Sequence, residues 1–312
     1  MTAIVIGVDG GGTKTRAIVA DEHGASIIEA TGPGSAVKPG EAERSADVIE
    51  SVAREALAAC NMSHVTPRVL CVGVAGVGAD EQRQALWQAL VARELAEEIV
   101  VHPDAMVAMD DAFGDGPGVL VISGTGSVAF GRGPTGTFAR CGGWGPVIGD
   151  EGGGAWLGRR ALSSVAAAAD EREPATALTG AILTAAQVED VPALIPWAAK
   201  ATAADLAGLA PAVLRAAEGG DRRAATLVSL AVEELSLHAR TLARKLFVDE
   251  RATVPVAFSG GLLGPGSYLR KKLEHRLKSG VPGAQLHAAP VDAARGAVKG
   301  ALRYLGVVDA GA

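Results

Sequence analysis

The sequence predicts an α/β protein whose two halves open in the same way. Near the start, a strand over residues 3–8 runs into a glycine-rich turn, and a second strand follows at 14–20. Further along, a strand at 119–122 is followed by a turn of Ser, Gly and Thr and by a return strand at 128–131. The repeated order of strand, polar glycine turn and strand indicates an internal duplication.

The other segments divide between two predicted domains. Residues 1–115 form an N-terminal α/β domain that carries the first glycine-rich turn. Residues 116–312 form a C-terminal α/β domain with a largely helical segment over 155–250. A last helix, 292–305, closes the chain, and we expect it to pack back on the N-terminal domain. No low-complexity linker separates the halves, so we expect them to enclose a cleft.

Composition excludes several classes of protein. The 312 residues are 48% hydrophobic, enough for about two domains of ~100–200 residues. The net charge is −6, and no basic cluster is dense enough to follow a nucleic-acid backbone. No unbroken apolar run reaches the ~18–20 residues that cross a bilayer, and the N-terminus lacks signal-peptide features. We therefore expect a cytoplasmic protein that binds neither nucleic acid nor membrane.

The first glycine-rich turn has the composition of a phosphate-binding loop. It reads Asp9-Gly10-Gly11-Gly12-Thr13-Lys14-Thr15. Glycine has no Cβ, so backbone N–H groups can converge on an anion, while Thr13 and Thr15 add hydroxyls and Lys14 a charge. A Walker A loop or a dinucleotide fingerprint would need a helix after the turn, and a strand follows here. Taken alone, the loop can also be a plain glycine hairpin.

A second loop of the same kind favours a nucleotide site. The residues expected to bind the nucleotide are Gly11, Gly12, Thr13 and Lys14 in the first loop, Gly124, Thr125, Gly126 and Ser127 in the second, and Gly260 and Gly261 after the strand 254–258. Two such loops in duplicated halves can hold one polyphosphate between them, which is most of what phosphoryl transfer requires. Asp9 is then placed to hold Mg²⁺. The predicted cofactors are ATP and Mg²⁺.

The order of these elements resembles the superfamily of ATPases that contains actin, hexokinase and the heat-shock chaperones. Within it, the motifs at 7–15, 122–127 and 141–152 look like those of the N-acetylglucosamine kinases and of the wider BadF/BadG-type ATPase family. The resemblance covers most of the chain and is weakest over 160–245. It implies two duplicated ribonuclease H-like domains around an ATP cleft, phosphorylation of an amino sugar by ATP, and a homodimer.

The acceptor side depends first on Asp104. It follows a strand and precedes an apparent helix over 105–113. By resemblance it is the catalytic aspartate, the general base that accepts the proton of the sugar hydroxyl. The alternative is that Asp104 only caps the helix. The later carboxylates Asp110, Asp111 and Asp115 are expected to be solvated charges.

The motif at 141–152 contains glycines that let a ligand approach the backbone, one indole and two carboxylates. A sugar needs this mixture, because its ring face stacks on an aromatic side chain and its hydroxyls donate to carboxylates. By resemblance Gly143, Trp144 and Asp150, together with Asp104, bind the amino sugar, although a tryptophan at position 144 can also be a core residue. At Ala36 the N-acetylglucosamine kinases of the family carry an asparagine that grips sugar hydroxyls, and at Val128 some relatives carry another. Because buried hydrogen bonds give such sites their discrimination, Ala36 leaves the sugar open among N-acetylglucosamine, glucosamine and related hexosamines.

Two other functions remain open. An ATPase that energises a partner redox enzyme would share the loops but also bind an iron–sulfur cluster, for which Cys60, Cys71 and Cys141 offer no recognisable pair. A regulator that binds sugar without catalysis would not need both Asp9 and Asp104. The presence of both carboxylates therefore argues against this function.

Overall fold

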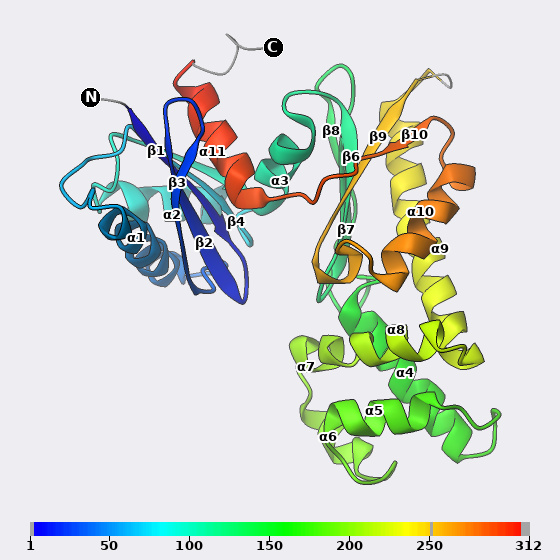
Figure 1. Cartoon of the computed structure of the whole chain (residues 1–312). Coiled ribbons are helices and arrows are strands. Elements are labelled where there is room, and N and C mark those ends of the chain that lie inside the picture. Colours follow the sequence, from blue (N-terminus) through cyan, green and yellow to red (C-terminus); the bar gives the residue numbers. More distant parts are fainter. Residues whose placement is uncertain (1–2, 250–251, 307–312) are drawn as a thin grey trace. The chain divides into compact units, whose positions relative to one another are not determined.

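The computed structural model describes residues 3–249 and 252–306 (Figure 1). The chain divides into unit 1, made of residues 1–115 and 291–312, and unit 2, made of residues 116–290. Within the described ranges, no helix combines the length and the apolar character needed to cross a membrane.

Unit 1 is built on a five-stranded sheet in the order β3-β2-β1-β4-β5. Its strands are β1 (Ile4–Gly10), β2 (Lys14–Asp21), β3 (Ser26–Pro33), β4 (Val69–Val74) and β5 (Glu98–Pro103). The first three form an antiparallel meander, and β4 and β5 extend it parallel to β1. Every residue of β4 is buried, as expected for an apolar parallel strand covered on both faces.

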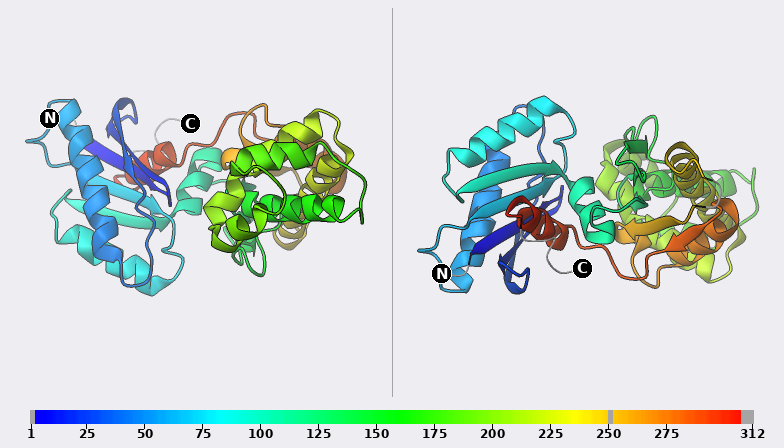
Figure 2. Two further views of the ribbon diagram at one scale, coloured as in Figure 1. Left: turned by 90° about the horizontal axis from the view of Figure 1, so that it is seen from below. Right: turned by 90° about the horizontal axis from the view of Figure 1, so that it is seen from above.

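Helices cover both faces of this sheet. On one face α1 (Ala42–Ala59) and α2 (Asp80–Val91) pack around the core that includes Ile49. On the other, α3 (Asp104–Phe113) and α11 (Ala293–Tyr304) pack around Val107 and Val298, and the views in Figure 2 show α1 and α11 on opposite sides of the strands. In α11 the apolar residues recur at helical spacing, so its buried stripe faces the sheet.

Unit 2 repeats the topology of unit 1. Its strands are β6 (Gly118–Ser123), β7 (Ser127–Arg132), β8 (Phe138–Gly142), β9 (Val254–Ser259) and β10 (Ala284–Leu286). Again three strands form an antiparallel meander, β6-β7-β8, and two more, β9 and β10, extend it parallel to the first. The shared strand order confirms the predicted α/β fold with duplicated halves.

The helices of unit 2 lie mainly in one insertion between β8 and β9. They are α4 (Gly154–Ala169), α5 (Leu178–Ala186), α6 (Leu194–Lys200), α7 (Ala203–Gly208), α8 (Ala210–Glu218), α9 (Arg222–Leu246) and, after β9, α10 (Tyr268–Gly280). The long helix α9 packs on β7 and β8 and also on α8 and α10. It therefore ties the helical insertion and the sheet into one hydrophobic core.

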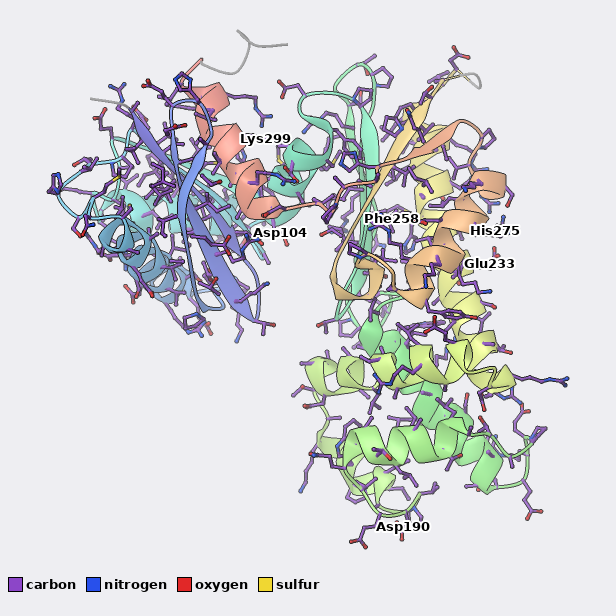
Figure 3. The ribbon with its side chains drawn as sticks, viewed as in Figure 1. Asp104, Asp190, Glu233, Phe258, His275 and Lys299 are labelled. Atoms are coloured by element: carbon purple, nitrogen blue, oxygen red, sulfur yellow. The ribbon has the colours of Figure 1, made fainter. Side chains whose placement is uncertain are left out.

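Helix α3 carries two carboxylates that we expected to be solvated, and that expectation was wrong. Asp110 and Asp111 are only 3% and 7% exposed. The reason is that cationic side chains of α11 form ion pairs with these two carboxylates of α3. Nε and Nη2 of Arg295 each donate to Asp111 at 2.7 Å, and Nζ of Lys299, labelled in Figure 3, lies 3.0 Å from its Oδ1. Arg303 pairs with Asp110 in the same way.

Asp111→Ala is expected to lower the free energy of unfolding by about 2–4 kcal/mol. The change removes the acceptor of the Asp292 N–H, which donates to Asp111 Oδ2 at 2.8 Å, and removes one ion-pair partner each from Arg295 and Lys299. Burial opposes ionisation, but the bonds from Arg295, Asp292 and Lys299 hold the pKa of Asp111 below its usual value. The stabilisation is therefore present at neutral pH and lost as the pH falls through that lowered pKa.

Urea denaturation near pH 7 and near pH 3 measures both effects. Asp115→Ala is the matched control, because the Asp115 side chain is 73% exposed. Equal stabilities of the Asp111 and Asp115 variants would contradict the account of this contact.

Candidate active site

The glycine-rich loop between β1 and β2, residues 11–13, is called the first phosphate loop after its predicted role. The N–H of Gly11 donates to the carbonyl oxygen of Lys14 at 2.9 Å and closes the turn. Within residues 3–249 and 252–306, no acceptor takes the N–H groups of Gly12 and Thr13, and both residues are exposed together with Lys14. Two free N–H donors, a hydroxyl and an ammonium group are thus exposed on one short turn, a composition that can bind an anion.

One expected donor of this loop is engaged elsewhere. Thr15 is fully buried, and its hydroxyl donates to the carbonyl oxygen of Pro33 at 2.6 Å. Its oxygen also lies 2.8 Å from Oγ of Ser35. The expectation that the Thr15 hydroxyl adds a donor for phosphate was therefore wrong, because alternation along β2 turns this side chain into the unit.

Two carboxylates meet at one edge of the unit 1 sheet. Asp9 lies at the end of β1 and Asp104 directly follows β5, and these strands run parallel through β4, so their carboxyl ends share an edge. Burial, and next the charge of Asp104, raise the pKa of Asp9 to about 6. Burial also raises the pKa of Asp104. The geometry therefore brings the predicted metal ligand and the predicted base into one electrostatic neighbourhood.

Asp104 does not cap α3. It is the first helical residue, and Pro103 occupies the N-cap position without a side-chain bond to the helix. One oxygen of Asp104, Oδ1, accepts from the N–H of Ala105 at 2.9 Å (Asp104 is labelled in Figure 3). The N–H of Asp104 itself also contributes to holding the carboxylate, and no side chain of a described residue donates to it, so the carboxylate keeps the capacity to accept a proton.

Arg16 lies beside Asp9 and was missed in the sequence. The two residues are paired across the β1–β2 ladder, which puts their side chains on the same face of the sheet. Nη1 of Arg16 donates to Asp292 at 3.0 Å and Nη2 donates to Glu29 at 2.7 Å. The charge of Arg16 lowers the pKa of Asp9, whereas that of Asp292 raises it. Counting outwards from the turn would have found Arg16, because residues 9 and 16 lie opposite in any hairpin closed at 11–14.

The carboxylate of Asp9 is suited to a divalent cation. Asp9 is half-buried, burial raises its pKa, and no hydrogen bond from a described residue contributes to holding its charge. Among the residues that the structure describes, no group of three or more His, Cys, Asp or Glu side chains could hold a metal by itself. Mg²⁺ is commonly held by one or two carboxylates together with phosphate and water, so these residues fit a cation shared with a nucleotide.

The second phosphate loop joins β6 to β7 in unit 2. Its turn is closed by the N–H of Gly124, which donates to the carbonyl oxygen of Gly126 at 2.9 Å. In the described part of the chain the N–H groups of Thr125 and Gly126 have no acceptor. The hydroxyl of Ser127 is already engaged, since it is buried and donates to the carbonyl oxygen of Glu151 at 2.6 Å.

The glycine pair after β9 lies beside this second loop, because β9 is the parallel neighbour of β6. Gly260 has φ = 90°, and a Cβ there would lie 2.3 Å from the carbonyl oxygen of Ser123. Only glycine can take this position. Gly261 is exposed and starts the short 3-10 turn Gly261–Leu263. The structure thus brings the predicted nucleotide residues of unit 2 together.

The motif after β8 presents its tryptophan to solvent. Trp144 is 65% exposed, so the alternative of a core tryptophan was wrong. The guanidinium of Arg140 lies 5.0 Å from its ring centroid. Oδ1 of Asp150 accepts from the N–H of Gly145 at 3.1 Å, and burial raises the pKa of this carboxyl. Gly143 adopts φ = 72°, and the turn it makes holds the indole and the carboxylate in one short segment.

Two units of one topology, each with a phosphate loop between its first two strands, define a duplicated nucleotide-binding protein of the ATPase and phosphotransferase class. The chain belongs to the BadF/BadG/BcrA/BcrD ATPase family, whose model matches residues 6–302.

Similar proteins of known name are amino-sugar kinases. An N-acetyl-D-glucosamine kinase of Dictyostelium discoideum is 30% identical over 94% of this chain and 96% of its own length. An N-acetylmuramic acid/N-acetylglucosamine kinase of Clostridium acetobutylicum is 28% identical over the same shares. The crystal structure of a candidate N-acetylglucosamine kinase from Chromobacterium violaceum superposes with a TM-score of 0.79 at 31% identity, covering 95% of this chain and 98% of the other. The resemblance predicted from the motifs is confirmed.

Proposed function

We propose that this protein is an ATP-dependent kinase that phosphorylates a hydroxyl of an amino sugar. The observation that carries the proposal is the placement of Asp9, Asp104 and the first phosphate loop at one edge of the unit 1 sheet. Phosphoryl transfer needs a carboxylate that can bind a cation, a second carboxylate that can accept a proton, and N–H donors for the phosphate, such as the two free ones of this loop. The named kinases among the similar proteins support the same choice.

On the nucleotide side, we propose that both loops bind the polyphosphate of one ATP. The free N–H groups of Gly12, Thr13, Thr125 and Gly126 and the ammonium of Lys14 would take its oxygens. Gly260 and Gly261 would let the nucleoside approach the backbone beside the second loop. Mg²⁺ held through Asp9 supplies neutralisation of the charge on the phosphates.

On the acceptor side, Asp104 acts as the general base. The acceptor hydroxyl loses its proton to the free carboxylate oxygen of Asp104 as the hydroxyl oxygen forms a bond to the γ-phosphorus. The bond from that phosphorus to the β–γ bridging oxygen breaks, and ADP leaves with the electron pair. The raised pKa of Asp104 favours this step, because a more basic carboxylate accepts a proton more readily.

The sugar would be held by the segment that follows β8. The exposed indole of Trp144 offers a face for the ring, Asp150 offers a hydroxyl acceptor, and the turn at Gly143 offers backbone. Ala36 has only a methyl side chain, so the discrimination between N-acetylglucosamine and glucosamine has to come from other contacts. The proposed substrate is therefore a hexosamine as a class.

A panel of hexosamines with Mg²⁺ and ATP tests the proposal. ADP release that depends on N-acetylglucosamine, glucosamine or N-acetylmuramic acid is the expected result. ADP release at the same rate without any sugar would favour an ATPase that drives a partner protein. Sugar binding without ADP release would favour a sensor, and either outcome would reject the kinase.

The kcat/KM for ATP at low Mg²⁺ concentration is expected to fall as the pH drops through about 6. The pKa of Asp9 is about 6, and the protonated carboxyl no longer attracts a cation. Because protons and Mg²⁺ compete for the same group, tenfold more Mg²⁺ should move this acid limb to lower pH. Initial rates between pH 4.5 and 8, at two Mg²⁺ concentrations, measure the position of this limb. A limb at the same pH at both concentrations would contradict the role of Asp9.

A further inference from the structure

In unit 1 a buried hydroxyl pair fastens the first phosphate loop to the segment that follows β3. Thr15 and Ser35 are both 0% exposed, and their oxygens lie 2.8 Å apart. The Thr15 hydroxyl donates to the carbonyl oxygen of Pro33 at 2.6 Å. The N–H of Ala36 donates to the carbonyl oxygen of Gly11 at 3.1 Å. Loop and segment are thus joined by side-chain and backbone hydrogen bonds.

Unit 2 contains the same device at its own loop. Ser123 and Ser127 are 0% and 3% exposed, and their hydroxyls donate to the carbonyl oxygens of Gly152 at 2.8 Å and Glu151 at 2.6 Å. The backbone adds a second pair of bonds in the other direction. These are Gly154 N to Gly124 O at 2.8 Å and Ala155 N to Thr125 O at 2.9 Å.

The joined segments approach each other so closely that a Cβ would not fit between them. A Cβ on Gly34 would lie 2.3 Å from the carbonyl oxygen of Gly12 in the first loop. A Cβ on Gly126 in the second loop would lie 2.2 Å from Oδ2 of Asp150. Contacts of this kind leave no room for adjustment, because packed interiors transmit a displacement instead of absorbing it.

The proposed function puts Asp150 in unit 2 on the acceptor side, and the resemblance puts the position of Ala36 in unit 1 there too. Ala36 follows Ser35 directly, and Asp150 precedes Glu151 directly. We propose that Thr15 and Ser127 are positioning residues that fix each phosphate loop to the acceptor-binding segment of its own unit. The proposal rests on the proposed kinase function. Their task is to hold the γ-phosphate in line with the acceptor hydroxyl, so that the phosphoryl group passes to the sugar and not to water.

This role separates binding from transfer. The loops would still present free N–H groups without the buried hydroxyls, so nucleotide affinity depends little on them. In-line transfer depends on the placement of the reacting atoms to within a fraction of an ångström, and a small misplacement is costly. A loosened loop would therefore lower kcat and let water compete with the sugar for the γ-phosphate.

The test uses Thr15→Val and Ser127→Ala, which remove the hydroxyls at little cost in shape. Thr15→Ser keeps the hydroxyl and should restore the wild-type behaviour. Ser236→Ala is the control, because Ser236 is a buried serine of the same unit as Ser127, 3% exposed, on α9, and its Oγ lies beside Gly280. ADP and sugar phosphate are both quantified in each reaction with ATP, Mg²⁺ and N-acetylglucosamine or the best acceptor of the panel, and ADP binding is measured by calorimetry.

In Thr15→Val and Ser127→Ala we expect kcat to fall about tenfold while the Kd for ADP changes less than about threefold. The ratio of ADP to sugar phosphate should rise from one to two or more. A purely structural role would reduce the active fraction and leave this ratio at one. A ratio of one in both variants would overturn the proposal, and the same holds if Ser236→Ala shows the same rise. Failure of the wild-type protein to phosphorylate any acceptor would instead reject the proposed function, before any variant is compared.

Discussion

Asp104→Asn is expected to lower the kcat for sugar phosphorylation by about 10²–10⁴-fold, the usual contribution of a general base. The amide has nearly the shape of the carboxylate and can keep the bond from the Ala105 N–H to its oxygen. It cannot take the proton of the acceptor hydroxyl. The chemical step should therefore fail while the nucleotide site stays intact.

The measurement pairs steady-state rates with the Kd for ADP, which we expect to change less than about twofold. Asp115→Asn serves as the control, because it makes the same substitution at a largely exposed carboxylate of the same unit. A variant that keeps near wild-type kcat would show that another group is the base. Parallel loss of kcat and of ADP binding would show that Asp104 holds the nucleotide site together instead.

Asp9→Asn is expected to remove activity and at the same time to stabilise the fold. The pKa of Asp9 is raised from 3.8 to about 6, first by burial and then by the charge of Asp104. A carboxyl that binds its proton more tightly when folded than when unfolded destabilises the fold once it ionises. This cost is absent below the unfolded pKa of 3.8 and complete above about 6.

The size of the effect follows from the shift in pKa. Each unit corresponds to about 1.4 kcal/mol, so Asp9→Asn should raise the free energy of unfolding by about 1–3 kcal/mol at neutral pH. Thermal unfolding without Mg²⁺ and nucleotide, near pH 7.5 and near pH 4, measures it, with Asp115→Asn as control. The gain should shrink at the lower pH. A loss of stability at neutral pH would contradict the view that a cation, and not the protein, balances this charge.

The parts of the fold that the sequence predicts are those with a local signal. Each phosphate loop is one run of Gly, Thr and Ser between two short apolar strands, and the repetition of that run revealed the duplication. The strand β10 gave no signal, because it is only three residues long, Ala284–Leu286. The strand β8 was not predicted either, because it is short and follows a loop that contains Gly and Pro.

The parts of the site that were missed depend on contacts over long stretches of chain. Asp111 is buried because Arg295 and Lys299 arrive from α11, and no local pattern shows that contact. The hydroxyls of Thr15 and Ser127 look like phosphate ligands by composition. Only the packing of distant segments against the loops shows that Pro33 and Glu151 take these hydroxyls.

The central claim is that the γ-phosphoryl group of ATP passes to a hexosamine hydroxyl. Incubation with ATP labelled in its γ-phosphate, followed by mass spectrometry of the sugar, tests this claim most directly. The account predicts a labelled hexosamine monophosphate formed in equal amount to ADP, and formed about 10²–10⁴-fold more slowly by Asp104→Asn. Label found only in inorganic phosphate, at a rate independent of the sugar, would contradict it.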